Sequence, residues 1–129
     1  MANIRSLQMA DAVCADARVR LEKRFLGLSV RAVYAPTGSP LRCKTLELTA
    51  EDGKRMHNIL TLSREQMLSA LADLKLCSVY NGNYVLELAA SEDARFVALQ
   101  LFHYVQLGYE PVTDVLFLEG DEARCAAGL

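Results

Sequence analysis

Two histidines and four cysteines are the residues of this sequence that could supply a nucleophile and its base. The histidines are His57 and His103, and the cysteines are Cys14, Cys43, Cys77 and Cys125. A thiol nucleophile needs a histidine within hydrogen-bond reach and a third group that orients it. The spacing marks no such pair, and no Cys-x-x-Cys or Cys/His cluster has the spacing of a zinc site. We expect no catalytic residue, no metal and no cofactor, and we expect reduced, mostly buried thiols.

Two pairs of adjacent carboxylates, Glu92–Asp93 and Asp121–Glu122, are further candidates for proton transfer. The first pair follows a serine that is typical of a helix N-cap, where negative charge is stabilised by the helix dipole. The second pair lies in an acidic segment near the C-terminus. We expect a structural role for the first pair and a solubility role for the second. An enzymatic function is therefore the least favoured of three functional hypotheses.

The length and composition of the chain indicate what kind of domain positions these residues. The chain has 129 residues, of which 52% are hydrophobic and 23% charged, and its net charge is −2. A chain of this kind buries one core and is too apolar to be intrinsically disordered. The apolar run 96–107 is too short to span a membrane, and the first residues lack the apolar core of a signal peptide. We therefore expect a cytoplasmic protein without a membrane partner.

The spacing of apolar residues and turn signals predicts three helices and a largely antiparallel sheet. The helices are expected over 4–26, 63–76 and 92–107, and the strands over 28–34, 41–49, 56–62, 77–80, 83–89 and 112–118. Asn81-Gly82 favours a tight hairpin turn between two of these strands. The prediction is a single two-layer α+β domain over 1–118, with a five- or six-stranded sheet in the order αβββαββαβ, followed by an acidic C-terminal tail over 119–129.

Without the last strand, this element order is similar to that of the small dimeric chaperones of bacterial type III secretion. The similarity extends over about the first 107 residues and rests on the order of elements rather than on a motif. It implies a non-enzymatic dimer that binds another protein.

The predicted helix 92–107 and the last predicted strand carry more apolar side chains than one sheet face can cover. A helix on a single sheet needs an apolar stripe of only about 100°. Either the first helix or the tail covers this excess, or it forms an interaction surface of a homodimer. The residues that we expect in such a surface are Phe96, Leu99, Phe102, Val115 and Phe117.

The charge is unevenly distributed along the chain. Residues 1–60 contain ten Lys and Arg against six Asp and Glu, and residues 61–129 contain four against ten. The basic residues that could form an anion or nucleic-acid patch are Arg18, Arg20, Lys23, Arg24 and Arg31. The alternative is a solvated face that is neutralised within the fold.

The leading functional hypothesis is a non-enzymatic cytoplasmic accessory protein that acts through protein–protein association. We expect it to be a homodimer that also binds an unidentified protein, as an adaptor or a secretion-chaperone-like module. The alternative hypothesis is a nucleic-acid-associated regulatory protein that uses the basic N-terminal half, although the overall acidic charge makes nucleic acid the less favoured partner.

Overall fold

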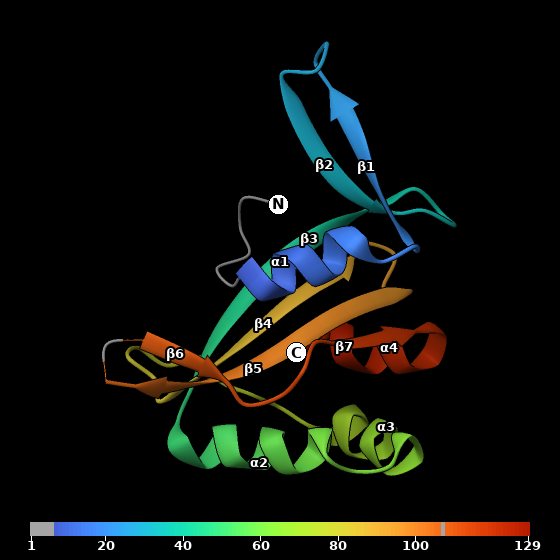
Figure 1. Ribbon diagram of the computed structural model, residues 1–129. Helices are drawn as coiled ribbons and strands as arrows, with labels where there is room; N and C mark the ends of the chain where they lie inside the picture. The colour runs from blue at the N-terminus through green and yellow to red at the C-terminus, as the bar shows by residue number, and fades with distance from the viewer. Residues whose placement is uncertain (1–6, 107) are drawn as a thin grey trace.

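The computed structural model describes residues 7–106 and 108–129, which form four helices and seven strands (Figure 1). In chain order the elements are α1 (Leu7–Ala15), β1 (Val19–Arg24), β2 (Ser29–Tyr34), β3 (Ser39–Leu48), α2 (Ala50–Leu60), α3 (Arg64–Asp73), β4 (Tyr84–Ser91), β5 (Phe96–Val105), β6 (Gly108–Pro111), β7 (Leu116–Glu119) and α4 (Gly120–Ala127). None of the described helices is long and apolar enough to cross a membrane.

The strands form one sheet in the order β1-β2-β3-β4-β5-β6, and every described strand pair is antiparallel. β6 and β7 share the outer edge of β5, where β7 pairs with residues 96–99 and β6 with residues 102–105. The predicted α+β class with a largely antiparallel sheet is therefore confirmed, with four helices instead of three.

Helices cover both faces of the sheet, although unequally. On one face α2, α3 and α4 enclose the larger core, which includes Leu86, Leu88 and Leu99 of the central strands. On the other face α1 contributes Met9 and Val13, which form a smaller core with alanines of β4 and β5. The three-helix layer and the single α1 lie on opposite sides of the sheet in Figure 1.

The prediction of a helix over 92–107 is wrong, because residues 96–105 form the central strand β5. The first seven residues of this strand are buried on both faces, between the two cores. A strand that is buried on both faces has a nearly continuous apolar sequence instead of an alternating one. The apolar excess is thereby explained within one chain; Leu107 lies outside the described residues.

Three other predictions are corrected by the structure. The strand expected over 56–62 belongs to α2, whose first turn is capped by Thr49, with the Oγ1 atom accepting from the amide of Asp52 at 3.2 Å. The helix expected over 4–26 ends at Ala15 and gives way to β1, and residues 4–6 lie outside the described part. The segment expected as a tail forms α4, and its Ala123 and Ala126 are fully buried in the larger core.

The Asn81-Gly82 pair does not connect two strands, and residues 77–80 are not a strand. Gly82 packs so closely against β3 that a Cβ atom there would lie 2.5 Å from the carbonyl oxygen of Leu48. The glycine is needed for close backbone approach and not for a type I′ hairpin turn.

Most of the remaining expectations agree with the structure. The strands expected over 28–34, 41–49 and 83–89 are β2, β3 and β4, and the helix expected over 63–76 is α3, which ends at Asp73. Of the strand expected over 112–118, only residues 116–118 lie in a strand, β7, and residues 112–115 are not strand. Ser63 caps α3 as its sequence indicates, because its side chain accepts from the amide of Gln66.

Candidate interaction surface

The β1–β2 hairpin, residues 19–34, projects from the body of the molecule (Figure 1). β1 and β2 pair along their whole length, over six residue pairs. β2 in contrast pairs with β3 only at its base, where Val33 lies opposite Pro40 and Tyr34 opposite Ser39. Most of the hairpin is consequently a two-stranded ribbon, with no third strand from residues 7–106 or 108–129 beside it.

Apolar side chains on this ribbon are exposed to solvent. Leu21 and Val30 in the strands are 52% and 51% exposed. At the tip of the hairpin, residues 25–28, Phe25 is 69%, Leu26 105% and Leu28 88% exposed. Single exposed apolar residues are common on protein surfaces, but a cluster on one projecting element is typical of an interaction site.

The tip has a left-handed backbone that is unusual for its residues. The φ angles of Phe25, Leu26 and Gly27 are 53°, 58° and 87°. Two hydrogen bonds close the turn, from the amide of Gly27 to the carbonyl of Arg24 and from the amide of Leu28 to the carbonyl of Phe25, both at 3.1 Å. Positive φ is easy for glycine or asparagine and costly for bulky residues. A bulky apolar pair in this conformation is the kind of strained feature that gathers at binding sites.

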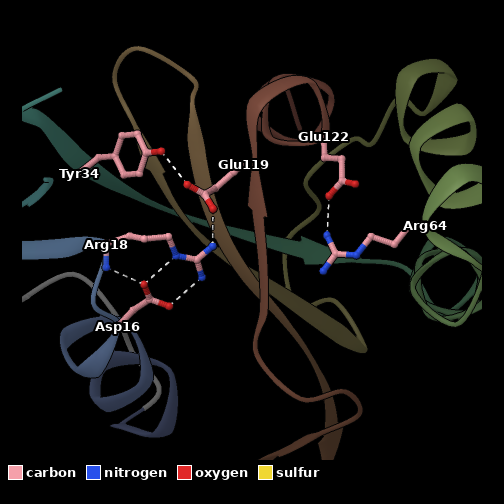
Figure 2. A network of polar contacts seen from close by, with 6 residues as sticks. All are labelled: Asp16, Arg18, Tyr34, Arg64, Glu119 and Glu122. Carbon is pink, nitrogen blue, oxygen red and sulfur yellow. Dashed lines mark hydrogen bonds and ion pairs between the residues drawn. The ribbon is translucent and has the colours of Figure 1, made fainter. Parts of the chain in front are cut away.

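The base of the hairpin is attached to the body by a polar network of four residues (Figure 2). The Arg18 guanidinium donates to Asp16 at 2.8 Å and to Glu119, at the end of β7, at 2.6 Å. The Tyr34 hydroxyl donates to the other oxygen of Glu119 at 2.7 Å. The guanidinium also lies over the rings of Phe96 and Phe117, at 5.2 and 5.3 Å.

Proton affinities in this network follow from its hydrogen bonds. The bonds from Tyr34 and Arg18 lower the pKa of Glu119, and the bond from Arg18 lowers that of Asp16. The hydrogen bond to Glu119 raises the pKa of Tyr34. The hydrogen bonds favour the charged form of both carboxylates, so the network is suited to hold the hairpin in place. Figure 2 also shows a separate ion pair between Arg64 of α3 and Glu122 of α4.

The basic residues that the sequence singled out belong to the hairpin and its base, but acidic side chains accompany most of them. Arg18 is held by Asp16 and Glu119, as described above. Arg20 and Arg31 both contact Glu22, at 3.0 and 3.1 Å. Lys23 and Arg24 are exposed near the tip, and the Arg24 guanidinium lies 5.2 Å from the centre of the Phe25 ring. The structure therefore shows a ribbon of mixed charge and not a basic patch.

The five residues predicted for the interaction surface are not brought together on the surface. Phe96, Leu99 and Phe102 are buried within the single chain, on strand β5. Val115 and Phe117 are half-buried and pack on the smaller core. Phe96 stacks between Tyr34 and Phe117, with ring centroids 5.3 and 6.0 Å away. These aromatic residues support the base of the hairpin from inside.

The candidate chemical residues do not form a catalytic arrangement among the described residues. A pocket of about 470 Å³ between α2 and residues 111–116 is lined by His57, Thr61 and Asp114, but its lining contains no cysteine. His103 stacks on Tyr84, at 4.5 Å. Within the described residues, no group of three or more His, Cys, Asp or Glu side chains could hold a metal ion.

The thiols and the carboxylate pairs are also placed differently from the expectation. All four cysteines are free, but Cys14 and Cys77 are exposed and Cys43 and Cys125 half-buried, so the prediction of mostly buried thiols is wrong. Burial raises the pKa of the Cys43 thiol, which makes it a poorer nucleophile. Glu92 and Asp93 lie in the turn between β4 and β5, and Glu92 pairs with Arg42.

The sequence does not reveal the tip, because the helix expected over 4–26 includes Phe25 and Leu26. One available signal was the alternation of charged and apolar residues from Val19 to Glu22, which is typical of a strand. In comparisons with protein-family models, curated proteins and solved structures, none matches this chain.

Proposed function

We propose that this protein is a non-enzymatic accessory protein that acts through protein–protein association. In this proposal it works as a homodimer, in the manner of an adaptor or a small secretion chaperone, and the β1–β2 hairpin is its association element. The observation that carries the proposal is the exposed apolar tip held in a strained left-handed turn. The exposure of Leu26 and its positive φ are both unfavourable in the isolated chain. Burial of the tip against another protein would compensate for both.

The location that fits this role is the cytoplasm, where the four free thiols would stay reduced. The alternative role in nucleic-acid binding is not favoured, because acidic side chains contact Arg18, Arg20 and Arg31. A phosphate backbone would have to displace these carboxylates before it could bind.

Sedimentation velocity at micromolar concentration tests the proposal. We expect the unmodified chain to sediment with twice its monomer mass of 14.3 kDa. The double variant Leu21→Asp/Leu26→Asp should sediment as a folded monomer, because it places two charges on the hairpin without changing the core. The matched control is Leu62→Asp/Tyr80→Asp, whose positions are 43% and 89% exposed outside the hairpin, and it should remain a dimer.

A monomeric unmodified chain would contradict the proposed homodimer. A hairpin variant that is folded and still dimeric would show that the association element lies elsewhere. Circular dichroism of each variant distinguishes loss of association from loss of folding.

A further inference from the structure

We propose that the partner of the hairpin is a second copy of this chain, paired edge to edge through β1 with Leu21 on the two-fold axis. This inference rests on the proposed function and specifies its contact. β1 is the outermost strand of the sheet and pairs only with β2 among the described strands. An outermost strand presents unpaired backbone donors and acceptors, which makes it a template for pairing with another chain.

The hydrogen bonds at the base of the hairpin determine which backbone groups face the open edge. The amide of Ala35 donates to the carbonyl of Arg18 at 2.8 Å, which continues the β1–β2 register by one pair. Hydrogen-bonded pairs alternate along an antiparallel ladder, so the even-numbered residues of β1 bond to β2. The backbone groups of Leu21 and Lys23 therefore face outward. At Val19 the carbonyl faces outward, while the amide donates to the carbonyl of Asp16 at 3.0 Å.

When two copies pair through this edge with two-fold symmetry, one residue of β1 lies on the axis, opposite its own copy. Repulsion between like charges limits which residue this can be. Placing Arg20, Glu22, Lys23 or Arg24 on the axis would put like charges directly opposite each other, which is destabilising. With Leu21 on the axis, Arg20 lies opposite Glu22 of the second copy, and Glu22 opposite its Arg20. Both cross-strand pairs are then attractive, so β1 is complementary to itself in this register.

Val19 on the axis is the remaining choice within β1, and it would set Arg20 against Arg18 of the second copy. With Leu21 on the axis, Arg18 instead meets Arg24. This pair lies at the ends of the contact, and the charge of Arg18 is already balanced by Asp16 and Glu119. The axis at Leu21 is therefore the best two-fold register that the strand offers.

In the same register, the outward-facing backbone groups of one copy meet hydrogen-bonding partners in the other, and the exposed apolar side chains of the two copies lie together. Leu21 exchanges two hydrogen bonds with Leu21 of the second copy, and each Lys23 amide meets the opposite Val19 carbonyl. Leu21 and Val30 share one face of the hairpin, because Leu21 lies opposite Ala32 and Lys23 opposite Val30. Pairing makes their half-exposed side chains into one apolar stripe across four strands. It also brings each tip to the level of the exposed Ala17 of the other copy.

Disulfide trapping tests the register directly. We would use the full chain with Cys14→Ser and Cys77→Ser, which removes the two exposed thiols. Facing Cα atoms in a hydrogen-bonded antiparallel pair are about 5.5 Å apart, within the range of a disulfide. Leu21→Cys should therefore form a covalent dimer when a micromolar solution is oxidised.

Val30→Cys is the matched control, because its position has the same exposure and lies on the same face, one strand further in. In the proposed dimer the two copies of this residue are three strand spacings apart across the sheet and four residue positions apart along it. The resulting distance of roughly 20 Å is too long for a disulfide. We expect its covalent dimer to form at least tenfold more slowly than that of Leu21→Cys.

Charge reversal supplies a second test. Arg20→Glu should weaken the dimer at least tenfold in Kd, because it sets two carboxylates against each other on both sides of the axis. Adding Glu22→Arg and Arg31→Glu reverses all three charges, which restores the pairs within and between the hairpins, and should restore the dimer.

The outcomes separate this inference from the proposed function. A dimer in which Val30→Cys crosslinks as fast as Leu21→Cys, or which the triple reversal does not restore, would overturn the β1 register and leave the homodimer standing. A chain that stays monomeric in sedimentation overturns both. Rapid trapping of Leu21→Cys together with rescue by the triple reversal supports the inference.

Discussion

Replacing Leu26 with glycine should stabilise the folded chain and at the same time weaken its association. A left-handed φ costs an L-residue roughly 1–2 kcal/mol, which glycine does not incur. Glycine costs about 0.5–1 kcal/mol in backbone entropy, so the expected net gain is about 0.5–1 kcal/mol in the free energy of unfolding. No buried contact is lost, because the Leu26 side chain is fully exposed.

The corresponding change in melting temperature can be worked from the length of the chain. Unfolding entropy is about 2.1 cal/mol/K per residue, so for 129 residues a gain of 1 kcal/mol raises Tm by about 4 °C. Urea and thermal unfolding should be followed by circular dichroism at concentrations below the association range, so that dimer formation does not contribute. Sedimentation at higher concentration then measures the loss of association.

Leu28→Gly is the matched control. Leu28 is 88% exposed in the same tip but does not have a positive φ. There glycine brings only its entropy cost, and the variant should lose about 0.5–1 kcal/mol. Stability changes in the same direction for both glycine variants would contradict the cost assigned to the positive φ of Leu26. Binding of a second copy by Leu26→Gly as tightly as by the unmodified chain would contradict the role of the tip in association.

Three further predictions concern Glu119, the packing of Gly53, and nucleic-acid binding. Since the pKa of Glu119 is lowered in the folded state, its stabilising effect is present above the unfolded-state pKa and is lost as the pH falls through the folded-state value. Urea unfolding between pH 5 and 3 should therefore show a smaller loss of stability for Glu119→Gln than for the unmodified chain, and equal losses would contradict the network. Gly53→Ala should destabilise the fold by about 1–3 kcal/mol, because its Cβ atom would lie 2.1 Å from the buried Tyr84 ring, whereas Gly128→Ala meets open space and should be nearly neutral in the same assay. Gel-shift assays with duplex DNA and single-stranded RNA at low salt should show no binding, and a shift that weakens steeply with salt would revive the nucleic-acid alternative.

The sequence correctly predicts those elements whose residue pattern is typical of only one kind of secondary structure. The Ser63–Gln66 capping pair identifies the start of α3, and the turn signals around Pro36 and Pro40 separate β2 from β3. These signals are local, so they depend little on the rest of the fold.

The error at β5 arose because burial on both sides of a strand removes the alternating pattern. Residues 96–102 of this strand are all buried, with Val97, Leu99 and Leu101 in the larger core and Ala98 in the smaller one, so exposed polar residues do not alternate with apolar ones there. In α2, the apolar Met56 and Ile59 were assigned to a strand because the helix begins among polar residues at 51–55. Such cases are decided by tertiary packing, which a single sequence does not display.

The expected exposure of Phe96 and Leu99 is wrong for the same reason. An excess of apolar side chains needs a cover, and for these two residues the cover is the rest of this chain. Leu26 and Leu28, in contrast, are among the large apolar residues that the fold leaves exposed. Exposure is a property of the folded chain, and composition alone does not reveal it.

Glu119 belongs to two structures at once, since it ends β7, precedes the first turn of α4, and binds Arg18 and Tyr34 at the base of the hairpin. Fraying of the C-terminal helix would thereby loosen the anchor of an element nearly a hundred residues earlier in the chain. In hydrogen exchange, the amides at the base of the ribbon should become exchangeable together with those of the last helix, as one cooperative unit.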